Sequence, residues 1–234
     1  MSLVVYGTVF AIMSVLYIIL RSGQKGEFAF SKRMGEKLPE NFLVALKIIP
    51  AGLAAFYVIL ERGLSDWFYV GIALALVFCL LGDFGIEKSF LVGMGFFALA
   101  QLTFITSYLV KVAQLGFGTS QLTIVLVLII CFTAYVVFFV RFLDRGGDGL
   151  GEFKGPVAVY SILISGMVVA TIFYLLVSNE LLVILPVAGA LSFVVSDSII
   201  ASREFRRSPP YQVLLVHFTY YLALFLISLV VLVG

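Results

Sequence analysis

Four ionisable side chains lie inside long apolar stretches of this sequence, where a charge is costly. They are Lys47, Asp83, Asp197 and His217, which is the only histidine. A charged side chain within an apolar membrane span costs about 2.5–3.5 kcal/mol on insertion scales, so such residues usually pair with one another or have a function. Two carboxyl groups in such a setting can divide the roles of a proton donor and an ionised partner.

The depths of these four residues in their apolar segments match. Lys47 and His217 each follow the start of a segment by about six residues, which is ~9 Å at the helical rise of 1.5 Å per residue. Asp83 and Asp197 lie within about one turn of the ends of two other segments. If these four segment ends share one side of a membrane, the four side chains lie at one level, as a shared polar pocket requires.

Other polar residues accompany this set. Ser192 and Ser196 are four residues apart, and Tyr220 and Tyr221 lie one helical turn beyond His217. Serines on membrane helices more often hydrogen-bond between helices than act as nucleophiles. No base adjoins either serine in the sequence, so acyl-transfer chemistry has no direct support.

Each ionisable residue also has a purely structural interpretation, and the sequence leaves these interpretations open. Lys47 can extend its four-carbon stem to the headgroups. Asp83 borders a loop and can be a solvated helix end, whereas Asp197 can be a buried partner of Lys47. A lone histidine such as His217 is often only a hydrogen-bonded residue of a helical bundle.

The composition indicates which elements position these residues. The chain is 62% hydrophobic and 12% charged, with a mean hydropathy of +1.17, whereas a soluble domain is about 45–50% apolar and about 25% charged. The apolar runs lack the alternation of a membrane β-barrel. The net charge of +2 gives no reason to expect nucleic acid as a partner. Cys79 and Cys131 lie in apolar runs and are predicted to be reduced packing residues.

Eight segments are long enough to cross a bilayer core, which needs about 20 apolar residues per helix. They predict an all-α, polytopic integral membrane protein with one transmembrane domain over residues 1–234. Glycines and prolines separate them, and the glycine-rich stretch 146–151 is predicted to be a flexible connector. The predicted spans are 2–20, 41–60, 67–82, 90–110, 121–141, 156–177, 181–200 and 211–233.

The basic residues predict an orientation. The first, third, fifth and seventh loops carry 12 of the 15 lysines and arginines, the even-numbered loops carry 2, and Lys47 is the remaining one. Positively charged short loops stay in the cytoplasm. We therefore expect the first loop to be cytoplasmic and both termini to lie on the other side.

Four stretches of this chain match a known family in order. They are Leu46-Lys47-Ile48-Ile49-Pro50; Leu81-Gly82-Asp83-Phe84 with Phe90, Gly93, Met94 and Phe97; residues 188–198 with Phe205; and Thr219-Tyr220-Tyr221-Leu222-Ala223. Together they resemble the lysoplasmalogenase family, known in bacteria as YhhN. The resemblance covers roughly residues 40–230. Its most specific part is Ala188-Gly189-Ala190…Phe193…Ser196-Asp197.

The resemblance implies an eight-helix hydrolase that cleaves the vinyl ether of lysoplasmalogens to a fatty aldehyde and a glycerophospho-alcohol. It implies that Asp83 and Asp197 are the catalytic pair. The chain departs from the family at Gln101, where a histidine is usual, and at Leu224, where a glutamine is usual. Either departure can mean a different substrate or lost catalysis, and His217 can replace the missing imidazole.

This chemistry suits two carboxyls, as glycosidases illustrate. Protonation of the vinyl β-carbon gives an oxocarbenium ion, which water captures. Burial in an apolar bundle helps a carboxyl to keep its proton for this step. We expect Asp197 to be the acid, Asp83 to be the base or the stabilising anion, and Lys47 to keep one of them ionised or to bind phosphate.

The predicted partners are a lysolipid substrate and membrane lipid, with no nucleic acid, no cofactor and no metal; the oligomeric state is left open. The predicted supporting residues are Lys47, Gln101, Ser196, His217, Tyr220 and Tyr221. Three other functions remain open at this point. They are a small-solute or proton-coupled transporter, a non-catalytic lipid-binding protein, and a hydrolase with Asp83, Asp197 and His217 as metal ligands.

Overall fold

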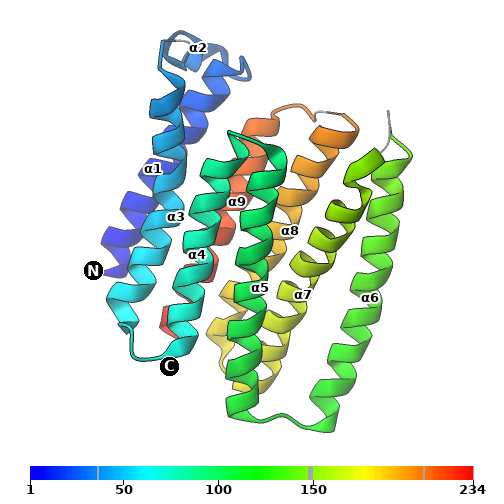
Figure 1. The fold of residues 1–234 in the computed structure, drawn as a ribbon. Helices are drawn as coiled ribbons and strands as arrows, with labels where there is room; N and C mark the ends of the chain where they lie inside the picture. Colours follow the sequence, from blue (N-terminus) through cyan, green and yellow to red (C-terminus); the bar gives the residue numbers. More distant parts are fainter. Residues whose placement is uncertain (36, 147–149, 208, 234) are drawn as a thin grey trace.

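The protein is a bundle of long, nearly parallel helices (Figure 1). The computed structural model describes residues 1–35, 37–146, 150–207 and 209–233. All regular secondary structure in these residues is helical. The α-helices are α1 Leu3–Gln24, α2 Ala29–Gly35, α3 Glu40–Arg62, α4 Trp67–Ile86, α5 Phe90–Leu115, α6 Thr119–Asp144, α7 Lys154–Ser178, α8 Ile184–Phe205 and α9 Gln212–Ser228. Short 3-10 turns cover Gly151–Phe153, Leu181–Val183 and Leu229–Leu232.

Eight of the described helices are long and apolar enough to span a membrane, which confirms the predicted fold class. Several of them continue past the predicted ends. Backbone hydrogen bonds do not depend on apolar side chains, so a helix can extend beyond the last apolar residue. In this way α4 reaches Ile86 and α8 reaches Phe205. The predicted first loop contains the short helix α2, which was not predicted because its seven residues are too few to cross a membrane. Part of the predicted glycine connector, residues 147–149, lies outside the described residues.

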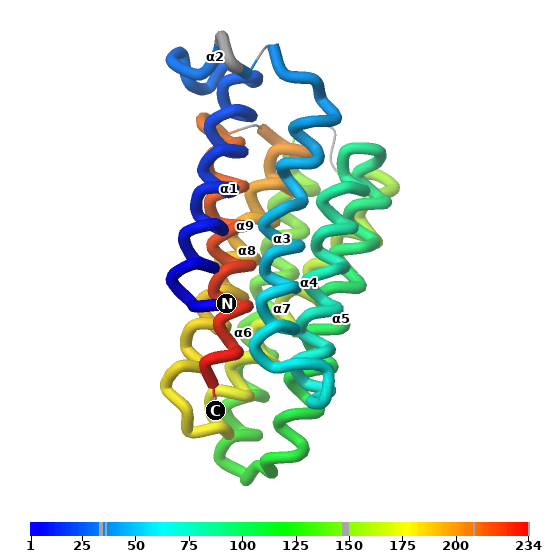
Figure 2. Tube along the Cα trace, turned by 90° about the vertical axis from the view of Figure 1, so that its left-hand side faces the viewer, coloured from blue at the N-terminus to red at the C-terminus, as the bar shows by residue number. Residues whose placement is uncertain are grey.

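The connections define two ends of the bundle. Helix α2 and the α4–α5, α6–α7 and α8–α9 connections lie at one end, named here the α2 end (Figures 1 and 2). Both termini lie toward the opposite end, and the amino group of Met1 donates to Glu61 Oε1 at 3.0 Å near the end of α3. The four segment ends discussed above therefore do share one side.

Two glycines allow close helix contacts beside the residues of interest. A Cβ atom on Gly93 of α5 would lie 2.7 Å from the backbone of Ile86 on α4. A Cβ atom on Gly189 of α8 would lie 2.9 Å from the carbonyl oxygen of Ala223 on α9. Small residues let membrane helices approach to backbone contact. The first contact packs α4, which carries Asp83, against α5, and the second packs α8, which carries Asp197, against α9.

Helix α6 packs differently from the others. It lies at the edge of the bundle and contacts mainly α7 (Figure 1). Only 11% of its most apolar window is buried within the protein, compared with 56% for α9 and the turn after it. Most of the α6 surface is therefore available to lipid.

Candidate functional site

A polar cavity of about 360 Å³ lies between the helices near the α2 end. It brings together Lys47 of α3, Asp83 of α4, Asp197 of α8, and His217 and Tyr220 of α9. The matched depths in the sequence therefore correspond to a shared space. The other charged residues along its wall are Arg21, Lys25, Glu87, Arg203 and Glu204.

Asp83 is enclosed by protein. Its residue is 3% exposed, and its Oδ2 accepts a hydrogen bond from the Tyr220 hydroxyl at 2.7 Å. Asp83 lies in the last turn of α4, three residues before Ile86. It is therefore not a solvated helix end, because it is buried against Tyr220 of α9 and Lys47 of α3.

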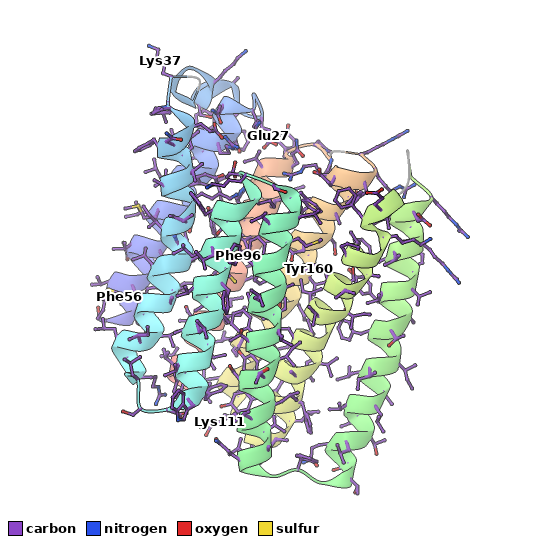
Figure 3. The ribbon with its side chains drawn as sticks, viewed as in Figure 1. Glu27, Lys37, Phe56, Phe96, Lys111 and Tyr160 are labelled. Carbon is purple, nitrogen blue, oxygen red and sulfur yellow. The ribbon has the colours of Figure 1, made fainter. Side chains whose placement is uncertain are left out.

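Asp197 lies farther from its helix end, eight residues before Phe205. Its Oδ2 accepts a hydrogen bond from the hydroxyl of Tyr160 on α7. Figure 3 shows the position of Tyr160 along α7, between the charged residues labelled at the two ends of the bundle. Each aspartate thus accepts one tyrosine hydroxyl, and the two tyrosines come from different helices.

Lys47 does not reach out to the headgroups. Its residue is 5% exposed, and its Nζ donates to Glu87 Oε1 at 2.6 Å and to the main-chain oxygen of Asp83 at 3.2 Å. Its carboxylate partner is Glu87, not Asp197. Arg21 lies within 3.5 Å of the same Glu87 carboxylate. Glu87 therefore connects two basic residues on one side of the cavity.

His217 is bonded to its own helix. Its Nδ1 lies 2.8 Å from the carbonyl oxygen of Val213, and its ring meets the edge of Tyr17 at 4.9 Å between centroids. A carbonyl only accepts, so Nδ1 carries the proton. The other ring nitrogen, Nε2, is then left for the cavity or a ligand.

The remaining predicted residues lie beside the cavity and not along its wall. Ser196 donates to the Val216 carbonyl at 3.2 Å and ties α8 to α9. Tyr221 donates to the Lys47 carbonyl at 3.1 Å and ties α9 to α3. Gln101 is fully buried on α5, close to the Tyr160 hydroxyl but without a hydrogen bond of ordinary geometry among the described residues.

Two residues of the site, Glu87 and Tyr160, were not predicted from the sequence, although their spacing in the sequence indicates their positions. Glu87 follows Asp83 by four residues and so lies one turn beyond it. Tyr160 follows the predicted start of its span by four residues, which places it near the level of the aspartates. Applying the depth criterion to tyrosines and to residues just outside the spans would have found both.

A second, apolar pocket of about 50 Å³ adjoins the polar cavity. The two share four lining residues, which are Ile86, Phe97, Asp197 and Ile200. The rest of the apolar pocket comes from α5, α6, α7 and α8, and includes Phe90, Met94, Tyr135, Phe139, Ile164 and Val194. Asp197 thus faces a polar space on one side and an apolar space on the other.

The described residues contain no group of three or more His, Cys, Asp or Glu side chains arranged to hold a metal ion. The arrangement of Asp83, Asp197 and His217 therefore adds no support to the metal-dependent alternative.

Fold and site together define a polytopic helical membrane protein with two tyrosine-bonded aspartates buried in one cavity. The sequence pattern of the YhhN family matches residues 42–231, so the chain belongs to the YhhN family. This range includes Lys47, Asp83, Asp197 and His217. Neither a curated protein nor a solved structure was found to match the chain.

Proposed function

We propose that this protein is a membrane-embedded hydrolase that cleaves the vinyl ether bond of lysoplasmalogen-like lysolipids. The observation that carries the proposal is the position of Asp197. This carboxyl shares a polar cavity with Asp83 and also faces an apolar pocket. A lysolipid has one polar and one apolar end, and its vinyl ether lies at the junction between them. Membership of the YhhN family is consistent with this activity.

In the proposed reaction, Asp197 donates its proton to the β-carbon of the vinyl ether, and the alkene electron pair forms the new C–H bond. Water adds to the oxocarbenium carbon and gives a proton to Asp83. The hemiacetal then collapses as its C–O bond breaks. Asp83 protonates the leaving glycerol oxygen, and Asp197 takes the hydroxyl proton. The products are an aldehyde and a glycerophospho-alcohol, and both carboxyls return to their initial states.

The neighbours of each carboxyl support this division of roles. The Lys47 ammonium bonds to the main chain of Asp83 and so lies on its side of the cavity. A nearby cation stabilises a carboxylate, which suits Asp83 as the ionised partner. Asp197 has no ion pair among the described residues, and its bonded partner is the neutral Tyr160. This setting suits a protonated carboxyl.

The proposal includes an orientation and a set of partners. The charge distribution favours a cytoplasmic α2 end, so the cavity would serve the cytoplasmic leaflet. The partners would be a lysolipid substrate and membrane lipid, with no nucleic acid.

The test is aldehyde release by the purified protein in detergent micelles. A lysoplasmalogen should yield one aldehyde per cleaved molecule. The saturated 1-alkyl ether with the same headgroup should bind without turnover, because it has no alkene to protonate. Failure to release aldehyde from any vinyl-ether lysolipid would rule out the hydrolase and favour a lipid-binding member of the family in which Gln101 and Leu224 replace the usual residues.

A further inference from the structure

We infer that Arg203 of α8 binds the phosphate of the lysolipid headgroup and thereby makes the site selective for phospholipid over neutral glycerol ethers. This inference rests on the proposed function, since it assigns the polar end of the same substrate. It is carried by the charges around the cavity and by the spacing along α8.

Among the basic residues of the cavity, Lys47 and Arg21 already have acidic partners. Lys47 pairs with Glu87 at 2.6 Å. Arg21 donates to Glu40 at 2.5 Å and lies 3.5 Å from Glu87. Their positive charges are therefore neutralised within the protein, and neither is free for an anion without breaking a short ion pair.

Arg203 has no hydrogen bond or ion pair with the rest of the described chain, and it lines the cavity while half-buried. Lys25 is in the same situation but is exposed at the outer rim. A guanidinium is suited to phosphate, because its planar fork donates two parallel hydrogen bonds. Arg203 is therefore the residue of the inner wall that is best placed to receive an anion.

The spacing between Arg203 and Asp197 fits the substrate. The two residues are six positions apart on α8, which is about 9 Å along the axis at the helical rise. Seven bonds separate the vinyl β-carbon from the phosphorus in a lysophospholipid. An extended chain advances about 3.5 Å per three bonds, so these seven bonds span about 8 Å. A substrate with its β-carbon at Asp197 thus brings its phosphate to the level of Arg203.

A second group in the cavity also lacks a partner. Gln212, the first residue of α9, lines the cavity, and its buried Oε1 accepts no hydrogen bond from the described residues. A buried acceptor without a donor costs about 1–3 kcal/mol. The free hydroxyl on the middle glycerol carbon is a donor that a lysolipid has and a two-chain lipid lacks. Such a donor can satisfy the Gln212 Oε1 at the cavity wall.

The experiment compares two vinyl-ether substrates with the same chain, a lysoplasmenyl-ethanolamine and the 1-alkenyl glycerol without phosphate. Arg203→Gln should lower kcat/KM for the phosphate-bearing substrate by about 10–100-fold, mainly through KM, because a hydrogen-bonded charge pair is lost. It should leave the alkenyl glycerol unchanged. Arg203→Lys should restore part of the loss. Arg207→Gln, which removes an exposed charge just beyond α8 and outside the cavity wall, is the matched control and should behave as wild type.

Binding of the saturated-ether lysophospholipid gives a readout independent of turnover, and Arg203→Gln should weaken it by the same factor. An equal effect of Arg203→Gln on both substrates, an equal effect of Arg207→Gln, or unchanged binding would overturn the inference. Tight binding of inorganic phosphate alone would indicate a free-anion site and would also overturn it. If the wild-type protein releases no aldehyde but binds the lysophospholipid in a way that Arg203→Gln weakens, the hydrolase proposal is refuted and the phosphate site is supported.

Discussion

The ion pair between the buried Lys47 and the exposed Glu87 yields a prediction that does not depend on catalysis. Lys47 Nζ lies 2.6 Å from Glu87 Oε1, and the two side chains are 6% and 23% exposed. At an effective dielectric constant near 20, two unit charges at this distance attract by about 6 kcal/mol before desolvation. Removing one partner of a buried pair typically costs 3–5 kcal/mol, because the other charge is left uncompensated. We expect Glu87→Gln, which leaves the buried Lys47 ammonium without its carboxylate partner, to destabilise the protein by about 3 kcal/mol.

A double-mutant cycle isolates the pair. Lys47→Met, Glu87→Gln and the double variant would be unfolded reversibly in mixed micelles with a rising fraction of denaturing detergent, and followed by circular dichroism. The double variant should lose less free energy of unfolding than the two single losses together, by about 1–3 kcal/mol. The exposed pair Lys154–Asp144 has the same distance of 2.6 Å, with side chains 59% and 34% exposed. It serves as the control and should show little or no coupling, because water and salt screen an exposed pair. Additive losses at Lys47 and Glu87 would contradict the ion pair.

Three further predictions concern the reaction and the membrane. Tyr160→Phe and Tyr220→Phe should each slow aldehyde release by about 10–100-fold, because each removes a hydrogen bond to a carboxyl group; wild-type rates in both would show that the tyrosines are not needed. A chelator such as EDTA should leave the rate of the wild-type protein unchanged, and a loss restored by added metal would favour a metal-dependent reaction. Single cysteines at Lys37 and Lys111, which lie at opposite ends of the bundle (Figure 3), should react from the cytoplasmic and the non-cytoplasmic side respectively, in a background without Cys79 and Cys131; the reverse pattern would invert the orientation.

The depth of each ionisable residue in the membrane can be predicted from the sequence, because the helical rise converts residue number into distance. That arithmetic placed Lys47, Asp83, Asp197 and His217 at one level, and the structure places all four along one cavity. It did not give the partner of Lys47. Which carboxylate meets the amine depends on helix rotation and on which helices are neighbours, so that Glu87 pairs with Lys47 and Asp197 does not.

The roles of the tyrosines and the presence of the short helix α2 also could not be predicted from the sequence. Tyrosine is common near membrane interfaces, so the sequence does not distinguish Tyr160 from the other tyrosines, whereas its hydrogen bond to Asp197 does. The charged residue Lys32 sits in α2, whose seven residues are too few to produce a membrane-length pattern. Likewise, the sequence does not show that Gly93 packs against Ile86 at the end of the helix that carries Asp83.

The central claim is that Asp197 supplies the proton that begins vinyl-ether cleavage. The direct test is the rate of aldehyde release by Asp197→Asn, compared with wild type and with Asp66→Asn at the opposite end of the bundle. Asp66 caps α4 through the Phe68 amide, and asparagine keeps such a cap. General acid–base roles are worth about 10²–10⁴-fold in rate. We therefore expect a loss of at least ~100-fold in Asp197→Asn, with circular dichroism unchanged, and a near wild-type rate in Asp66→Asn. A wild-type rate of aldehyde release by Asp197→Asn would contradict the account.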